Sequence, residues 1–360
     1  MLSPNRQLER DRPGPTLSIG LPVYNGENYL EQAVRSLLAQ TFTDFELILC
    51  DNASTDRTRS ICEAFARDDP RVRYVQHETN QGLIRNFNHA FEVARGVYFK
   101  WMAHDDLIDP EFTGRCIQEL QRDDSIAVCA TAVQVIDAEG FTLEDPEPQV
   151  GRHRDPLGMT QLHDRPGSER GLDHSHPRVR HRGVLLKSIR CYEEFGVIRS
   201  AALRRTPLRE YYPGSEKVML TELSLIGSIK VLPEPLMYMR VHDDRLSSQS
   251  GSGDRRALYL APSPHRRGPS LPPQARCAWG YWRTIWRQPL TLRNRVGCAW
   301  NFVRFLLQVR KWVAVLRIAL LNQSPVVSAP ALTRGPRIGA DQATEPTTPP
   351  ARTPQLTHHA

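Results

Sequence analysis

Short apolar runs alternate with helical patterns through residues 17–136, and this alternation constrains the fold more than any other feature. The apolar runs predict five strands, at 17–23, 45–50, 72–76, 97–102 and 126–136. Apolar residues at helical spacing predict four helices, at 27–39, 57–67, 83–94 and 110–121. Strands that alternate with helices of about a dozen residues form βαβ units. The sequence therefore predicts an α/β, Rossmann-type fold with a mostly parallel sheet flanked by helices.

Polar residues follow three of the predicted strands at the points where those strands end. Residues 22–27 close the first strand, Asp51 follows the second, and the residues 104–106 follow the fourth. In open parallel sheets, ligands bind outside the carboxyl ends of the strands. These residues are therefore the first candidates for a binding site.

Asp105 and Asp106 have the chemistry of a metal site. Carboxylates at a strand end can hold a hard divalent ion, and such an ion can bridge the two phosphates of a nucleoside diphosphate. The alternative is that the two carboxylates cap a loop or the helix that begins at Pro110. The neighbouring polar strand ends favour the metal site.

Asp51 directly follows an apolar run at 47–50. A carboxylate in this position can accept hydrogen bonds from a base or a ribose. The alternative is helix capping, which Asp51 or Ser54 can provide without any ligand. Ligand contact is the favoured interpretation for Asp51, and capping for Ser54.

Several spaced motifs then carry a family resemblance. The run Leu-Ser-Ile-Gly-Leu-Pro-Val-Tyr-Asn-Gly-Glu at 17–27 is followed by Leu-Ala-Gln-Thr at 38–41 and by Cys-Asp-Asn-Ala-Ser-Thr-Asp at 50–56. Asn-Gln-Gly at 80–82, Arg-Asn at 85–86 and a turn at Gly96 continue the pattern. Together they resemble the amino half of family 2 glycosyltransferases, a large inverting family with a GT-A fold. The resemblance covers residues 16–140 strongly and 185–245 more weakly.

The resemblance implies a nucleotide diphosphate sugar as donor and Mg²⁺ or Mn²⁺ as cofactor. It places Pro22, Tyr24, Glu27 and Asp51 in the nucleotide site. Arg85 is in reach of the donor phosphates under this interpretation, and the alternative is that it is a surface charge of its helix.

The family's metal motif usually reads Asp-x-Asp, whereas residues 103–106 read Ala-His-Asp-Asp. Ala103 replaces the first Asp of the motif. The resemblance therefore makes Asp105 the expected metal ligand, with Asp106 beside it. Arg240 and His242 lie where the family often places residues that face the diphosphate.

An inverting transfer needs a base near the acceptor hydroxyl, opposite the leaving diphosphate. The resemblance makes Glu216 the candidate catalytic base, with Glu222 in reserve. The alternative for Glu216 is a first-turn acid that the helix dipole favours.

The expected activity is transfer of a sugar to a glycan or lipid-linked acceptor with inversion, in cell-envelope or exopolysaccharide synthesis. Because Ala103 departs from the metal motif, the alternative is a non-catalytic protein that binds nucleotide sugars.

The composition along the chain predicts four segments. We expect a disordered amino terminus, a catalytic domain, a basic helical appendage and a disordered tail, at 1–15, 16–250, 255–325 and 326–360. Within the catalytic domain we expect a nucleotide-binding half, a mobile loop and an acceptor half, at 16–140, 145–182 and 185–245.

The appendage is both basic and rich in tryptophan. Residues 255–325 hold thirteen Arg or Lys and no Asp or Glu, and five of the six Trp of the chain lie between 279 and 312. Trp beside Arg suits the headgroup region of an anionic membrane, which predicts peripheral membrane contact. The alternative is a helical hairpin that packs on the catalytic domain. A nucleic-acid partner is not expected, because no recognisable nucleic-acid module accompanies the charge.

The expected location is the cytoplasm, at the inner face of the cell membrane. The seven Cys are an odd number and contain no Cys-x-x-Cys pair, which argues against a disulfide framework and a thiolate zinc site. Residues 1–15 lack the apolar core of a signal peptide. Four basic residues interrupt the apolar stretch at 296–321, which argues against a simple transmembrane helix.

Overall fold

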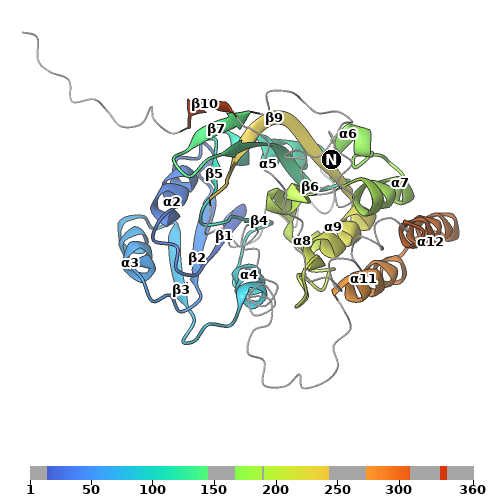
Figure 1. The fold of residues 1–360 in the computed structure, drawn as a ribbon, viewed down its shortest axis with the longest axis horizontal. Helices are drawn as coiled ribbons and strands as arrows, with labels where there is room; N and C mark the ends of the chain where they lie inside the picture. The colour runs from blue at the N-terminus through green and yellow to red at the C-terminus, as the bar shows by residue number, and fades with distance from the viewer. Residues whose placement is uncertain (1–13, 145–166, 189, 243–272, 309–332, 339–360) are drawn as a thin grey trace, which may run out of the picture.

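A computed structural model describes residues 14–144, 167–188, 190–242, 273–308 and 333–338. These residues form a ten-stranded sheet whose main path runs β10-β7-β6-β8-β4-β1-β2-β3, with β9 paired to both β5 and β6 (Figure 1). The strands are β1 Leu17–Val23, β2 Phe45–Asp51, β3 Val72–Gln76, β4 Tyr98–Trp101, β5 Leu107–Ile108, β6 Ile126–Ile136, β7 Phe141–Glu144, β8 Val197–Arg199, β9 Ser228–Arg240 and β10 Thr333–Arg337. The predicted α/β class is confirmed.

Helices cover the sheet, and some of them lie beyond it on one side. The α-helices are α2 Leu30–Leu38, α3 Thr58–Asp68, α4 Leu83–Glu92, α5 Phe112–Arg122, α6 Gly167–Arg170, α7 Pro177–Arg182, α8 Ser200–Leu203, α9 Ser215–Ile226, α11 Pro273–Arg287 and α12 Leu292–Leu306. A π-helical turn η1 spans Gly183–Lys187, and a 3₁₀ turn η2 spans Tyr192–Phe195. The four predicted amino-terminal helices are all present, and each begins within three residues of its predicted start.

Strand β2 explains why the sheet needs helices on both faces. Successive side chains of a strand point to opposite faces, and all seven residues of β2 are buried. Leu47 and Leu49 pack in one hydrophobic cluster with α2, α3 and α5, whereas Ile48 and Cys50 pack in another with α4 and α9. A continuous apolar run in the sequence therefore marks a strand in the middle of a three-layer structure.

The parallel pairings carry the longest registers. Strand β1 lies between β2 and β4, β2 pairs with β3, and β6 pairs with β9, all in parallel. The antiparallel pairings of β5, β7, β8 and β10 each align at most three residue pairs. The carboxyl ends of β1, β2 and β4 consequently meet at one edge of the sheet, where the polar motifs were expected.

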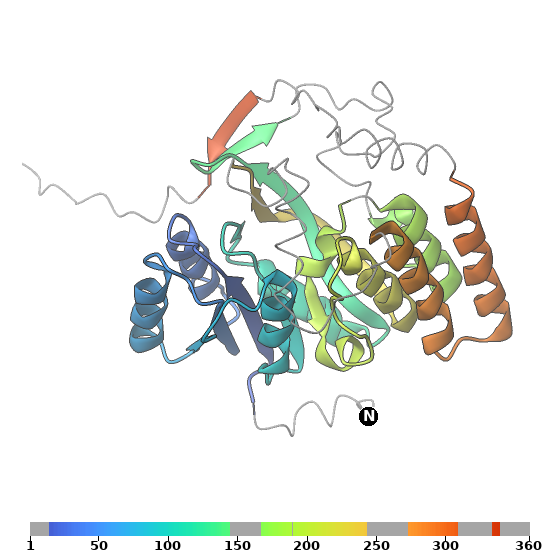
Figure 2. The ribbon, with the colours of Figure 1, turned by 60° about the horizontal axis from the view of Figure 1, so that its bottom comes forward.

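Two segments differ from the sequence-based expectation. The predicted mobile loop at 145–182 is wrong for residues 167–182, which contain helices α6 and α7; residues 145–166 lie outside the described part of the chain. The segment is rich in Arg and His, yet Arg180 is buried and donates to the carbonyl oxygens of Ser224 and His174. The predicted disordered tail contains strand β10, which pairs with β7 (Figure 2).

Helices α11 and α12 form a hairpin against the catalytic domain (Figure 2). Tyr281 and Ile285 on α11 and Cys298 and Phe305 on α12 are buried in two small hydrophobic clusters shared with α9 and η1. The hairpin alternative from the sequence is therefore what the structure has at 273–308. None of the helices in the described ranges is long and apolar enough to cross a membrane.

Candidate active site

The loops that follow β1 and β2 are tied to each other by their own hydrogen bonds. The backbone NH of Asn25 donates to Ser54 Oγ at 2.9 Å, and the NH of Thr55 donates back to Asn25 Oδ1 at 2.9 Å. The NH of Gly26 donates to Thr58 Oγ1 at 2.8 Å. Glu27 Oε2 accepts from the backbone NH of Arg57 at 3.1 Å. We call residues 24–29 and 52–58 the β1–β2 loop pair; these contacts fix its two halves as one unit.

Gly26 lets the loop pair approach the loop after β4. A Cβ atom at this position would lie 2.5 Å from Val23 Cγ2 and 2.7 Å from His104 Cδ2. Both distances are shorter than carbon atoms tolerate, so a side chain here would push the two loops apart. The glycine of the sequence motif thus brings the first strand end against the residues that precede Asp105.

Asp51 is fully buried at the end of β2. Its Oδ1 accepts from the backbone NH of Ser54 at 2.9 Å, and its Oδ2 accepts from Tyr74 Oη at 2.8 Å. Helix α3 begins only at Thr58, and it is Asp56 Oδ1 that accepts from the Thr58 NH at 2.9 Å. The capping alternative is therefore wrong for Asp51, which orders the turn after β2; a role toward a nucleotide stays a prediction.

Asparagine side chains extend this framework, and no individual role was predicted for them. Asn86 Nδ2 on α4 donates to the carbonyl oxygen of Cys50 at 2.9 Å, so the helix is fastened to the end of β2. Asn52 Oδ1 accepts from the NH of Gln81, and Asn52 Nδ2 donates to Asn80 Oδ1 at 2.8 Å. The spaced Asn-Gln-Gly and Arg-Asn motifs were the signal available for these contacts.

Arg85 does not point into this framework. Its Nη1 lies 2.6 Å from both carboxylate oxygens of Glu92, and both side chains are part-exposed. The surface-charge alternative describes Arg85 as the structure has it. A contact with donor phosphates would require this ion pair to break.

Asp105 and His242 form the second part of the site. The Nε2 of His242 lies 3.1 Å from Asp105 Oδ2, although the two residues are 137 positions apart in sequence. Strand β9 makes this contact possible. It pairs with β5, which begins directly after Asp106, and so residues 240–242 lie beside residues 102–106, the β4–β5 loop. The Tyr29 ring packs against the imidazole with a centroid distance of 4.7 Å.

Arg240 holds the end of β9 in place. Its guanidinium donates to the carbonyl oxygens of Asp105 at 2.9 Å and Ala138 at 2.8 Å, and to Gln32 Oε1 at 3.0 Å. It also lies 4.7 Å from the centroid of the Tyr29 ring. Burial lowers the pKa of Arg240, against the opposing effect of nearby Tyr29 and acidic groups. These contacts hold Arg240 inside the protein, so it fixes the end of β9 and with it the position of His242 rather than facing a ligand.

The side chain of Asp106 supports the end of β9. Its Oδ1 accepts from the backbone NH of Arg240 at 2.9 Å, which fastens the end of β9 to the β4–β5 loop. The capping alternative for the Asp-Asp pair is thus partly correct: Asp106 caps the end of a strand and not a helix. Among the two carboxylates, Asp105 is the one directed toward His242.

The donor atoms at this point suit a divalent ion with few protein ligands. Carboxylate oxygen and imidazole nitrogen are both ligands of Mn²⁺, while Mg²⁺ prefers oxygen. The Nδ1 of His242 is buried and has no hydrogen-bond partner among the described residues. No cluster of three or more such ligands occurs in the described ranges. Any ion here would take its remaining ligands from water or from a bound molecule.

Comparison with known proteins adds an independent observation. Residues 18–187 match the sequence model of Glycosyl transferase family 2. The chain is 36% identical over 126 residues to chondroitin synthase of Escherichia coli, a match that covers 35% of this chain and 18% of that protein. It is 34% identical over 128 residues to the putative glycosyltransferase EpsE of Bacillus subtilis, covering 35% of this chain and 46% of that protein. These matches span less than half of either relative.

Residues 18–187, just under half of the chain, form a glycosyltransferase family 2 domain. Its fold agrees with this: the crystal structure of S. aureus TarS 1–349 in complex with UDP-GlcNAc is similar with a TM-score of 0.54 at 18% identity, covering 86% of this chain and 76% of that one. At this level of identity the likeness shows the fold alone, which is the GT-A-like arrangement expected from the sequence.

Glu216 lies in the first turn of α9, the position of the helix-dipole alternative, and its role as the base stays a prediction. Its Oε2 is buried and has no hydrogen-bond partner among the described residues. It neighbours the buried pair of Glu194 and Arg209, in which Arg209 Nη2 lies 2.8 Å from Glu194 Oε2. Burial raises the pKa of Glu194 to about 7, with Arg209 opposing and Glu216 adding to the shift. Glu216 lies on α9, whereas Asp105 follows β4 and His242 follows β9.

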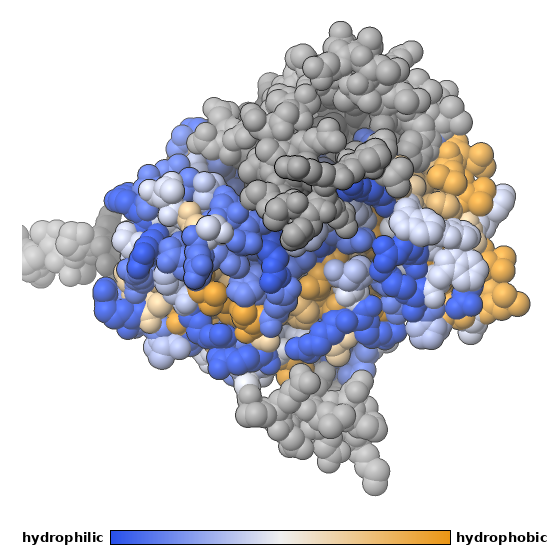
Figure 3. All heavy atoms as spheres, turned by 90° about the horizontal axis from the view of Figure 1, so that it is seen from below, coloured by the Kyte–Doolittle hydropathy of each residue, from blue (hydrophilic) through white to orange (hydrophobic). Residues whose placement is uncertain are grey.

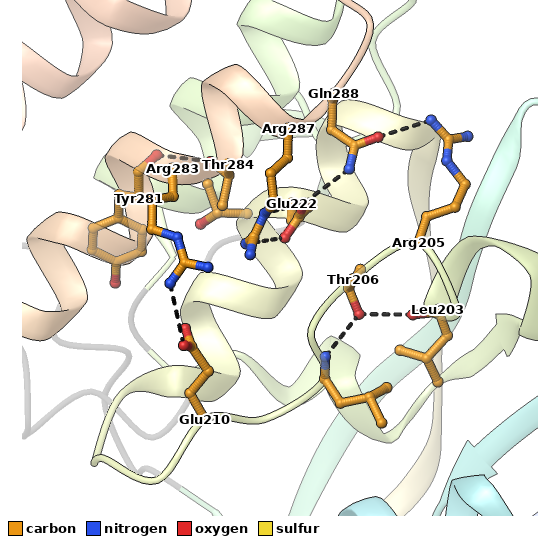
Figure 4. A network of polar contacts seen from close by, with 12 residues as sticks. Leu203, Arg205, Thr206, Glu210, Glu222, Tyr281, Arg283, Thr284, Arg287 and Gln288 are labelled. Atoms are coloured by element: carbon orange, nitrogen blue, oxygen red, sulfur yellow. Dashed lines mark hydrogen bonds and ion pairs between the residues drawn. The ribbon is translucent and has the colours of Figure 1, made fainter.

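Glu222 is a structural residue, so its role as the reserve base is wrong. Its side chain is fully buried and accepts from Arg287 Nη2 at 2.6 Å and from Gln288 Nε2 at 2.8 Å, both at the end of α11 (Figure 4). Gln288 in turn accepts from Arg205 at 2.8 Å. A carboxylate held in this way joins the helical hairpin to the catalytic domain, and it has no open side for an acceptor.

Proposed function

We propose that this glycosyltransferase moves a sugar from a nucleotide diphosphate sugar to a saccharide acceptor, with inversion at the anomeric carbon. The observation that carries the proposal is the pairing of Asp105 with His242, 3.1 Å apart, next to the β1–β2 loop pair. A rigid loop framework and a metal-competent pair at one sheet edge are what binding of a nucleoside diphosphate requires.

The β1–β2 loop pair is the proposed nucleotide site. Tyr24 is 41% exposed and offers an aromatic face to a base. Glu27 and Asp51 border the same loops, and the buried Pro22 shapes the end of β1. The S. aureus protein of similar fold was solved with UDP-GlcNAc, which supports a nucleotide sugar as the donor class.

Asp105 and His242 are the residues that would hold Mg²⁺ or Mn²⁺, and the imidazole favours Mn²⁺. Such an ion supplies positive charge against the diphosphate as it leaves. Asp106 and Arg240 keep the two ligands in position through the contacts at 2.9 Å described above. Ala103 removes one carboxylate of the usual motif, and His242 compensates for it in this proposal.

Glu216 is the proposed base. It accepts the proton of the acceptor hydroxyl while the hydroxyl oxygen forms a bond to the anomeric carbon. The bond from that carbon to the diphosphate oxygen breaks on the opposite face, and the diphosphate leaves with the electron pair. Glu216 Oε2 has no hydrogen-bond partner among the described residues, and this unmet acceptor supports the role.

The acceptor class is a glycan or a lipid-linked sugar. Relatives named as a chondroitin synthase and as a putative glycosyltransferase support polysaccharide or cell-envelope synthesis as the setting. We place the protein in the cytoplasm at the inner face of the cell membrane, with α11 and α12 as the part nearest the membrane.

The second candidate is a protein that binds nucleotide sugars without turning them over, and Ala103 is the observation that favours it. Titration with UDP, GDP and dTDP, with and without Mn²⁺, followed by donor-hydrolysis and acceptor-panel assays, separates the two. We expect metal-enhanced nucleotide binding together with slow donor hydrolysis. Binding without turnover on any acceptor would favour the second candidate, and absence of nucleotide binding would contradict both.

A further inference from the structure

Helix α12 has two apolar faces, and only one of them is used for packing. Cys298, Asn301 and Phe305 are buried against the domain. Six large apolar side chains of the helix and its end remain exposed, and five of them share one side. These five are Leu292 at 77%, Val296 at 61%, Trp300 at 61%, Val303 at 39% and Leu307, just after the helix, at 65%; the sixth, Leu306, is 44% exposed. We call these five residues the α12 stripe.

The spacing of the stripe makes it one continuous surface. At about 100° per residue, its five members fall within an arc of about 80° on the helix. Arg293 and Arg304 flank this arc on one side and Arg295 flanks it on the other. Figure 3 shows hydrophobic side chains gathered at the edge of the molecule where α12 lies. The sequence alone did not separate these faces, because both sides of the helix are apolar.

A groove on this surface combines apolar walls with basic groups. It has a volume of about 690 Å³ and is lined by Leu292, Val296, Gly297, Trp300, Arg178 and Arg293. Gly297 makes it possible, since a Cβ there would lie 2.9 Å from Arg178 Cδ. Apolar walls beside two guanidinium groups match a lipid, which joins hydrocarbon to a phosphate.

The surroundings of the stripe repeat this chemistry. Trp286 on α11 is 53% exposed, and the Arg295 guanidinium lies 5.3 Å from the centroid of its ring. No acidic residue occurs in the sequence between 255 and 325. A surface that binds a protein partner of mixed charge would carry acidic as well as basic residues. A surface that binds an anionic partner needs basic residues alone, as here.

We propose that the α12 stripe is the surface by which this protein lies on an anionic lipid bilayer, with the helix parallel to the membrane plane. Amphipathic helices bind in this way when an apolar face enters the headgroup boundary and basic residues at its rims meet lipid phosphates. The opposite face of the hairpin stays on the domain through Glu222, Arg287 and Gln288. The inference does not depend on sugar transfer, and it assigns the contact to α12 rather than to the whole basic segment.

The test is sedimentation of the full chain with vesicles of phosphatidylglycerol, compared with vesicles of phosphatidylcholine. We expect binding to the first and little to the second. The triple variant Val296→Ser, Trp300→Ser, Leu307→Ser should weaken binding by about tenfold or more. The pair Arg293→Glu, Arg304→Glu should also weaken it by about tenfold or more. The matched control is Arg67→Glu with Arg122→Glu, which changes the charge equally on the catalytic half and should bind as the parent does.

Two further measurements on the same variants, the thermal unfolding midpoint and the oligomeric state, distinguish a lipid bilayer from other occupants of the α12 stripe. All changed side chains are exposed, so the thermal unfolding midpoint should stay within about 2 °C of the parent. If the stripe variant sediments with phosphatidylglycerol like the parent, the proposal is wrong. It is also wrong if the stripe variant unfolds at a much lower temperature, because the stripe then packs on another part of this chain, or if it turns a dimer into a monomer while vesicle binding is unchanged.

Discussion

The two parts of the site are built in different ways. The β1–β2 loop pair joins residues about 30 positions apart and satisfies most of its polar groups by itself, as in the reciprocal contacts of Asn25 with Ser54 and Thr55. The pair of Asp105 and His242 joins residues 137 apart and depends on strand β9 returning to β5. The first is a preformed framework set by local motifs; the second exists only when the whole sheet is complete.

The largest effect should come from the second part. Asp105→Ala should reduce sugar transfer by about 10³-fold, since it removes one of only two protein ligands proposed for the ion. Asp106→Asn is the matched control, because its amide oxygen can still accept from the Arg240 NH. Steady-state assays over a range of Mn²⁺ concentrations measure both. Equal loss in the two variants would mean that the acids act together in support of β9.

The amino ends of the same strands provide a purely structural contrast. Glu46 on β2 is buried; burial would raise its pKa, but hydrogen bonds from Arg95, Ser18 and Arg73 outweigh this and hold the pKa at about 2. Because this value lies below that of the unfolded chain, Glu46 stabilises the fold above about pH 4.5 and loses this effect as the pH falls toward 2. Glu46→Gln should lower the free energy of unfolding at pH 7 by about 3 kcal/mol.

Denaturant titrations from pH 7 to pH 3 test this contrast. The difference between Glu46→Gln and the parent should stay constant down to about pH 5 and shrink below about pH 4.5, while donor affinity at pH 7 stays unchanged. A difference that is constant with pH would show that the hydrogen bonds do not depend on the ionised carboxylate.

Two glutamates on α9 allow a catalytic role to be compared with a structural one. Glu216→Gln should reduce kcat by about 10²-fold and leave nucleotide affinity intact, as expected for a lost base. Glu222→Gln should instead lower the unfolding midpoint, because Arg287 loses its buried partner. Initial rates and thermal unfolding of both variants decide the matter. If Glu216→Gln keeps full kcat, the base is another residue.

The smallest effect should come from the loop pair itself. Asn25→Ala removes the two hydrogen bonds that Thr55 donates to Asn25 Oδ1, from its backbone NH and its hydroxyl. It also places alanine at a φ of 50°, so it should cost about 1–2 kcal/mol of stability. Nucleotide affinity should fall by about tenfold or less, because Gly26 and Glu27 still join the loops. Calorimetry with a nucleoside diphosphate measures this. A complete loss of binding would mean that the framework is less self-sufficient than its contacts indicate.

The same comparison explains what the sequence could and could not predict. Strand ends, turn residues and the family motifs lie close together along the chain, so β1, β2 and the loops around Asp51 were predictable. His242 was indicated only by the family resemblance, because no pattern in the sequence around it predicts a contact with Asp105. The burial of Glu222 depends on α11 packing across α9, which no pattern within either helix specifies. Helix α7 was missed because its Arg and His side chains become satisfied only in the folded domain.

The central claim is that Asp105 and His242 hold a divalent ion against a nucleotide diphosphate bound by the β1–β2 loop pair. Calorimetric titration of the full chain and of Asp105→Ala with UDP, GDP and dTDP, each with Mn²⁺ and with a chelator, tests it most directly. We expect one of the nucleotides to bind the parent protein at least about tenfold more tightly with Mn²⁺, and to bind Asp105→Ala weakly and equally in both conditions. An undiminished Mn²⁺ effect in Asp105→Ala would contradict the claim.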